Sequence, residues 1–139
     1  PREVGAPAEY PFQLIHYKTI AHAEGRGANI PWLQEIFGAH VGKTWGTWVE
    51  INPETARSMG IAAGDAVWVE SPIDRIQLPA VLYPGTRPDM VNIPYEPSNK
   101  SAGRWAGVHV NVNEIVAPEN DIMSGTAAWH STRVKIYKA

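Results

Sequence analysis

Histidine is the side chain with the widest chemical range in this sequence, because imidazole can bind a metal or move a proton near neutral pH. The chain has 5 histidines and no cysteine. His16 and His22 are six positions apart across the end of an expected strand and a loop. The other three are isolated along the chain: His40, His109 and His130. No pair has the i, i+4 spacing that joins two ligands on one helix face, so we expect no metal site, no disulfide and no cysteine-ligated cluster here.

Nucleophilic and acid–base catalysis have no better support in the sequence. No serine has the G-x-S-x-G setting of a hydrolase nucleophile. Asp65 and Glu70 are explained by a turn and by the surface of a strand, and no second feature places them in a cleft. The sequence therefore predicts that this segment has no catalytic residue.

The elements that would position other functional groups are clearest in the middle of the chain. Aromatic and β-branched residues at 48–51 predict a strand. Asn52 can then cap a short helix that starts at Pro53, and Gly60 supplies the left-handed residue that ends it. A Gly-Asp turn leads into a second strand at 67–69. These consecutive signals predict a compact strand–helix–strand unit.

The N-terminal part predicts a strand followed by a loop and a helix. The strand covers residues 12–17, and a glycine-containing loop covers residues 21–29. The helix is expected at residues 31–37, because proline suits the first helical position and a glycine follows. Asn29 or Ile30 would be its N-cap.

Three further strands are expected in the second half of the chain: 76–82, 90–93 and 133–137. Pro79 has no N–H to donate to a neighbouring strand, so the first of them is expected at a sheet edge or with a bulge. Residues 94–103 form a long loop rich in proline, serine and glycine. Valine alternates with polar residues over 108–113, which is the pattern of another extended segment.

Many short strands with few short helices are typical of a mainly β barrel. The 139 residues are 44% hydrophobic and include 6 tryptophans, which suits one domain with a substantial core. We expect residues 1–10 to be a linker or lead-in and residues 11–139 to be the barrel domain. A start at Pro1, without methionine, indicates a piece of a longer protein.

Charge and hydropathy limit the kinds of partner that this chain is expected to bind. The net charge is -2, the isoelectric point is near 6.2, and the basic residues are scattered, so we expect no nucleic-acid partner. No apolar run approaches the roughly 20 residues that cross a bilayer, so we expect no direct membrane span. The compartment stays open, and either side of a prokaryotic membrane, periplasmic or cytoplasmic, suits the sequence.

Three blocks of sequence occur in a familiar order. They are PFQLIHYKTIAHAEGRGANIPWLQEIFG, then INPETARSMGIAAGDAVWVES, then GVHVNVNEIVAPENDIMSGTAAWHSTRVKIYK. Together they resemble the C-terminal dinucleotide-binding domain of the molybdopterin oxidoreductases of the dimethyl sulfoxide reductase family. The resemblance implies a double-psi β-barrel (aspartate decarboxylase-like) with short helices. It also implies a bis-(molybdopterin guanine dinucleotide) cofactor with molybdenum or tungsten in the parent protein.

The resemblance further implies where the cofactor is contacted. One group of matching residues lies in and after the first strand, and the other lies in the closing segment. These candidate contacts are His16, Tyr17, Lys18, Thr19, His22, Asn29, Asn111 and Asn113. Asn111 is the preferred residue of the closing pair, with a register uncertainty of two positions. Purely structural roles stay open for several of them: Lys18 can be a solvated charge, and Asn29 can be a helix cap.

Three functional hypotheses follow from the resemblance. In the first, the domain holds one guanine dinucleotide half of the cofactor while the redox chemistry occurs elsewhere in the parent oxidoreductase. Its partners would be the rest of that chain, with iron–sulfur and membrane-anchor subunits as further candidates. In the second, the barrel is a cofactor-free scaffold in an iron–sulfur subunit of a respiratory complex. The third is a stand-alone double-psi barrel enzyme or recognition domain, which the first and last blocks disfavour.

Overall fold

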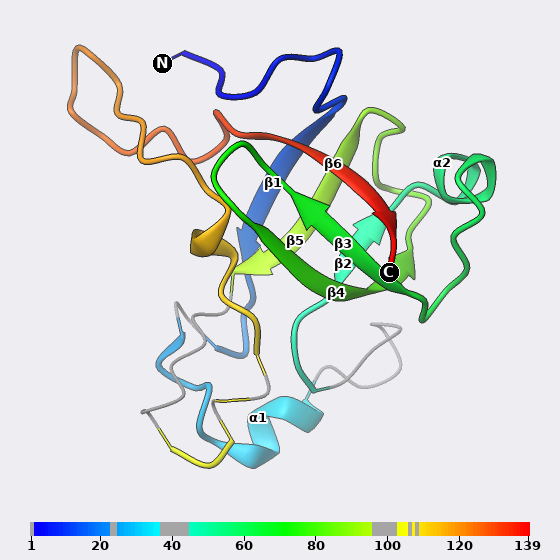
Figure 1. Cartoon of the computed structure of the whole chain (residues 1–139). Coiled ribbons are helices and arrows are strands. Elements are labelled where there is room, and N and C mark those ends of the chain that lie inside the picture. The colour runs from blue at the N-terminus through cyan, green and yellow to red at the C-terminus, as the bar shows by residue number, and fades with distance from the viewer. Residues whose placement is uncertain (1, 23–24, 37–44, 96–102, 106, 108) are drawn as a thin grey trace.

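The strands of this computed structural model form a closed barrel (Figure 1). The structure describes residues 2–22, 25–36, 45–95, 103–105, 107 and 109–139. The described strands are β1 (Phe12–Lys18), β2 (Val49–Ile51), β3 (Ala66–Glu70), β4 (Arg75–Leu82), β5 (Met90–Tyr95) and β6 (Arg133–Lys138). The described helices are α1 (Pro31–Glu35), α2 (Pro53–Ser58) and the 3-10 helix η4 (Val112–Glu114). The predicted mainly β barrel with short helices is confirmed.

The strand order around the barrel is β1-β5-β2-β4-β3-β6. Two pairs are parallel, β1 with β5 and β2 with β4, and the others are antiparallel. Parallel neighbours need a crossover connection, so segments far apart in sequence meet at the strand ends. The register of β1 on β5 places Lys18 beside Tyr95. This pairing places the end of the first strand beside the end of β5.

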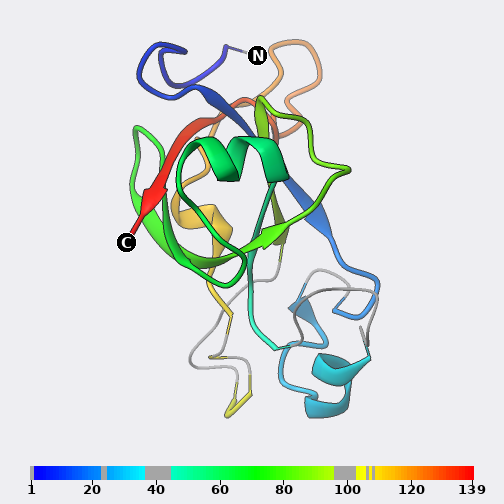
Figure 2. The ribbon, with the colours of Figure 1, turned by 90° about the vertical axis from the view of Figure 1, so that its right-hand side faces the viewer.

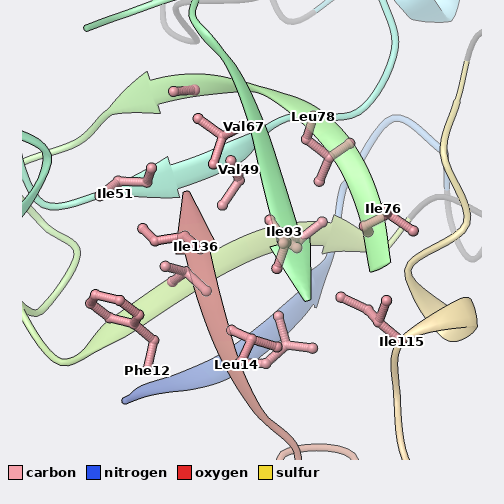
Figure 3. Close-up of a cluster of buried hydrophobic side chains, with 14 of the residues drawn as sticks. Phe12, Leu14, Val49, Ile51, Val67, Ile76, Leu78, Ile93, Ile115 and Ile136 are labelled. Atoms are coloured by element: carbon pink, nitrogen blue, oxygen red, sulfur yellow. The ribbon is translucent and has the colours of Figure 1, made fainter. Parts of the chain in front are cut away.

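The core fills the inside of the barrel. Side chains alternate between the two faces of a strand, so every second residue of each strand points inward. Figure 3 shows ten labelled members of this cluster: Phe12, Leu14, Val49, Ile51, Val67, Ile76, Leu78, Ile93, Ile115 and Ile136. Figure 2 shows α2 lying across one side of the barrel and α1 standing apart from it, beyond the end of β1.

The predicted central unit is confirmed, with strands at β2 and β3 and a helix at α2. The Asn52 side-chain oxygen accepts hydrogen bonds from the backbone N–H groups of Glu54 and Thr55, at 2.9 and 3.4 Å. Its amide nitrogen donates to the Thr86 carbonyl at 2.9 Å. Gly60 follows the C-cap of α2 at a φ of 69°, a value that favours glycine. Asn52 thus both caps α2 and ties it to the loop before β5.

Replacing Asn52 with alanine should lower the free energy of unfolding by about 1–2 kcal/mol, because a cap and a second hydrogen bond are lost together. Denaturant unfolding monitored by circular dichroism measures this. Asn52→Ser is the matched control, because its hydroxyl oxygen can still cap the helix and only the donor to Thr86 is lost. Equal losses in the two variants would contradict the capping role.

The first helix differs in its ends from the sequence prediction. It runs over Pro31–Glu35, and Phe37 lies outside the described residues. Ile30 is the N-cap and makes no side-chain capping bond, so Asn29 does not cap the helix. The Asn29 side-chain oxygen instead accepts a hydrogen bond from the Trp105 backbone N–H at 2.9 Å. Asn29 therefore joins two loops that are 76 positions apart.

Two prolines differ from their sequence predictions. β4 has neighbours on both sides, so the edge position predicted for Pro79 is wrong, while the alternative of a bulge stays a prediction. It lies where β4 passes from pairing with β3 to pairing with β2, because Pro79 faces Ala66 while Ala80 faces Val49. β5 also continues through Pro94 to Tyr95, two residues beyond the predicted end. The longer β5 places Tyr95 beside Lys18 at the end of β1.

The sequence predicts an extended segment at residues 108–113, of which the structure describes 109–113. These residues do not form a strand. The chain turns into η4 instead, and the Asn111 side-chain oxygen caps it by accepting from the Asn113 N–H at 3.1 Å. Val112 is fully buried in the barrel core. Val112 and Ile115 both enter the core from this segment, which therefore packs on the barrel without strand pairing.

The residues before β1 contact the last strand of the barrel. Val4 forms a parallel β-bridge with Thr132, and its N–H donates to the Ser131 carbonyl at 2.8 Å. Arg133 returns an N–H bond to the Val4 carbonyl at 2.9 Å. These bonds hold the start of the chain against the beginning of β6.

Candidate functional site

The alternation of β1 decides which predicted residues reach the site. Leu14 and His16 are on its buried face, while Ile15 and Tyr17 are half-buried on the other. The Tyr17 hydroxyl donates to the Glu50 carboxylate at 2.6 Å, outside the barrel core. Neighbouring residues of the first predicted group therefore point to opposite sides of the strand.

A cavity of about 390 Å³ lies beside His16, and we call it the His16 cavity. Besides His16, its walls come from the closing segment and include Asn113, Glu119, Asn120, Ala128 and Trp129. A second hollow of about 220 Å³ adjoins it through the shared residues His16 and Trp129, and includes Lys18, Tyr95 and His130. The two hollows join the end of β1 to the chain that precedes β6.

His16 is the central polar group of this site. It is 5% exposed, and its Nε2 lies 2.6 Å from the Trp129 carbonyl oxygen. A carbonyl only accepts, so Nε2 carries the proton and Nδ1 of the neutral ring is an acceptor. Nδ1 is buried and has no hydrogen-bond partner in the described part of the chain. Burial lowers the pKa of His16, more than the bond to Trp129 raises it, which favours the neutral ring.

Aromatic rings surround this imidazole. Trp129 stacks on His16 at 5.3 Å between ring centroids and an interplanar angle of 25°. Tyr95 meets the Trp129 ring nearly at right angles, at 5.8 Å. The Lys18 ammonium lies 5.7 Å from the Trp129 ring centroid, and the Asn113 amide donates to the Tyr95 hydroxyl at 3.3 Å. The site thus offers an acceptor, a carboxamide, a cation and apolar ring faces within one small volume.

His22 belongs to a separate buried polar cluster. Its ring centroid is 5.2 Å from that of His109. The Gln34 amide nitrogen lies 2.7 Å from His109 Nε2 and donates to the Ala28 carbonyl at 2.9 Å. This cluster fixes α1 against the segment that leads to η4.

The eight predicted residues are therefore only partly brought together. His16 and Asn113 line the His16 cavity, and Lys18 lines the adjoining hollow. The others lie elsewhere: Tyr17 against Glu50, Thr19 buried, His22 against His109, Asn29 against Trp105, and Asn111 at the start of η4. Of the two asparagines in the closing segment, it is Asn113 whose side chain reaches the cavity.

Tyr95, Trp129 and His130 line the site but were not among the predicted contacts. Trp129 is 41% exposed. An aromatic pair directly before the last strand was the available signal. It could be used only with the pairing of β1 beside β5 and β6, which a single sequence does not reveal.

Two other kinds of feature are absent from the part of the chain that the structure describes. Within it, no group of three or more His, Cys, Asp or Glu side chains is arranged to hold a metal ion. Among the same residues, no helix is long and apolar enough to cross a bilayer.

A cavity at the end of a closed barrel, between its first strand and its closing segment, is the architecture of a small-molecule-binding domain. The family model described as Molydopterin dinucleotide binding domain matches residues 12–133. The chain belongs to this family, as the three sequence blocks predicted.

Named relatives agree with this assignment. The chain is 34% identical over 146 residues to dopamine dehydroxylase of Eggerthella lenta, covering 100% of this chain and 13% of that protein. It is 33% identical over 150 residues to the arsenate respiratory reductase molybdopterin-containing subunit of Chrysiogenes arsenatis, covering 100% of this chain and 18% of that subunit. The fold is similar to that of acetylene hydratase from Pelobacter acetylenicus, with a TM-score of 0.72, 17% identity, and coverage of 96% and 19%. The chain thus spans less than one fifth of these proteins.

Proposed function

We propose that this domain holds one guanine dinucleotide half of a bis-(molybdopterin guanine dinucleotide) cofactor in a longer molybdenum or tungsten oxidoreductase. Residues 11–139 form the domain, and residues 1–10 lead into it from the rest of that polypeptide. The cofactor would supply two-electron redox chemistry, and the residues of this chain would bind and orient it.

The observation that carries the proposal is the buried, unpartnered Nδ1 of His16 at the wall of the cavity. A buried acceptor without a partner is costly unless a ligand or water satisfies it. Pterin and guanine rings both carry N–H donors on their edges, so such an acceptor matches their chemistry. The His16 cavity, about 390 Å³, falls in the range of small-molecule sites and suits one ring system of the cofactor.

The neighbouring groups complement other parts of a dinucleotide. The Asn113 carboxamide offers both a donor and an acceptor to a heterocycle edge. Lys18 supplies a positive charge beside the second hollow, which suits a phosphate. Trp129 and Tyr95 present ring faces on which a flat heterocycle can stack. These four residues therefore support binding and orientation, and none of them needs to react.

The test is the metal and pterin content of the purified full-length parent, made in a host that builds the cofactor. We expect stoichiometric molybdenum or tungsten and about two pterins per chain, measured by elemental analysis and by release of the fluorescent oxidised pterin. Absence of both from folded protein would overturn the proposal.

Within the same protein, Asn113→Ala should weaken cofactor binding about two- to tenfold, because one hydrogen bond to the ligand is lost. The rate of pterin loss during dilution measures this. Asn111→Ala is the matched comparison, because it removes the cap of η4 and leaves the Asn113 side chain in place. If the full-length protein holds the cofactor equally well with and without the Asn113 amide, Asn113 does not contact the cofactor.

A further inference from the structure

Two large apolar side chains stand fully in solvent at the tip of the closing segment. Ile122 is 94% exposed and Met123 is 96% exposed. They lie in the turn between Asn120 and Ala127, which are joined by an antiparallel bridge. Figure 1 shows this segment projecting from the barrel at the end away from α1. We call Ile122 and Met123 the apolar tip.

The turn that carries the apolar tip is held by its own hydrogen bonds. One carboxylate oxygen of Asp121 accepts from the backbone N–H groups of Met123 and Ser124, at 3.1 and 2.8 Å, and from the Ser124 hydroxyl at 2.9 Å. These bonds lower the pKa of Asp121. Gly125, at a φ of 69°, donates its N–H to the Asp121 carbonyl at 2.8 Å. The tip is therefore preorganised, which reduces the entropy that docking would cost.

The same segment forms one wall of the His16 cavity. Asn120, Ala127 and Ala128 line that cavity, and Trp129 lines both hollows. The cavity wall and the apolar tip therefore belong to one turn, joined across the bridge of Asn120 and Ala127. Whatever contacts the tip also fixes the position of the wall.

We propose that the apolar tip docks into an apolar recess on another part of the same parent polypeptide. The curated relatives are more than five times as long as this chain, so most of the polypeptide that could meet this surface lies outside it. Large apolar side chains in full solvent on a rigid turn mark an interaction surface. Docking to the remainder of the parent closes the outer side of the cofactor site.

Oxidation of methionine by hydrogen peroxide tests the docking in the full-length parent, because the reaction follows exposure of the sulfur. In the domain taken alone, the exposed fraction of Met123 is 96%, whereas that of Met59 is 37%. Peptide mass spectrometry gives the oxidation rate of each, relative to the same protein in denaturant. We expect Met123 to be protected about tenfold or more by its burial in the recess. Protection below about twofold would overturn the proposal.

Two repeats of this measurement distinguish docking to the parent chain from covering of the tip by a second copy or by the cofactor. The measurement is repeated over a hundredfold dilution, and protection that disappears with dilution assigns the tip to a second copy of the chain and overturns the proposal. It is also repeated on protein stripped of cofactor, and protection that vanishes there assigns the covering to the cofactor and overturns it too. Persistence in both arms supports docking to the parent chain.

A variant pair connects docking to the cofactor site. Ile122→Ser with Met123→Ser should lower the pterin content of the full-length parent severalfold. Ile73→Ser is the control, because Ile73 is 53% exposed in another hydrogen-bonded turn and does not line the His16 cavity. Equal pterin content in both variants would overturn the link. The docking proposal rests on the proposed function only because it takes the chain as one domain of a longer protein. The protection of Met123 can be measured even in protein that binds no cofactor.

Discussion

His16→Phe in the full-length parent is expected to retain less than about one tenth of the cofactor, since it removes the ligand acceptor and leaves the part-buried Trp129 carbonyl without its donor. Phenylalanine keeps the ring that stacks on Trp129, so packing changes little. The carbonyl of Trp129 loses its only described side-chain partner, which loosens the cavity wall. Pterin and metal content per folded protein measures the loss.

Tyr17→Phe is the matched control for that prediction. Tyr17 adjoins His16 in sequence and was assigned to the same cofactor loop by resemblance. Its hydroxyl, however, bonds to Glu50 on the opposite face of β1. Cofactor content should therefore stay at the wild-type level in Tyr17→Phe. A loss in this variant as large as in His16→Phe would place the site on the other face of the strand.

Local signals explain why the central unit could be predicted from sequence. The cap at Asn52, the proline after it and the left-handed Gly60 each act within a few residues. Each such signal needs no partner from elsewhere in the chain. The mainly β class followed from several short extended segments with few helices, and the resemblance implied the barrel.

The site could be predicted only in part, because its partners are distant in sequence. His16 and Trp129 are 113 positions apart, and Tyr95 reaches them only through a parallel pairing of β1 with β5. Nothing in a single sequence specifies that pairing. The resemblance pointed to the end of β1 and to the closing segment, yet strand alternation separates His16 from Tyr17 within the first of these. The change from an expected extended segment to η4 likewise moved the cavity contact from Asn111 to Asn113.

Leu14→Ala is expected to lower the free energy of unfolding by about 2–5 kcal/mol, because it leaves a cavity in a closed barrel. Leu14 is fully buried and points into the core beside its partner strands (Figure 3). It faces Val91 across the parallel pair, and its N–H donates to the Thr132 carbonyl at 3.1 Å. Denaturant unfolding of the parent, monitored by tryptophan fluorescence, measures the loss.

Ile15→Ala is the control, because Ile15 is half-buried on the outer face of the same strand. It should cost less than half as much as Leu14→Ala. The comparison also tests the site, since Leu14 and His16 share one face of β1 and a shift of one residue would exchange the faces. If Ile15→Ala were the more damaging substitution, then Tyr17 would face inward in place of His16. The order of these two stability losses therefore checks the orientation on which the proposed cofactor contact depends.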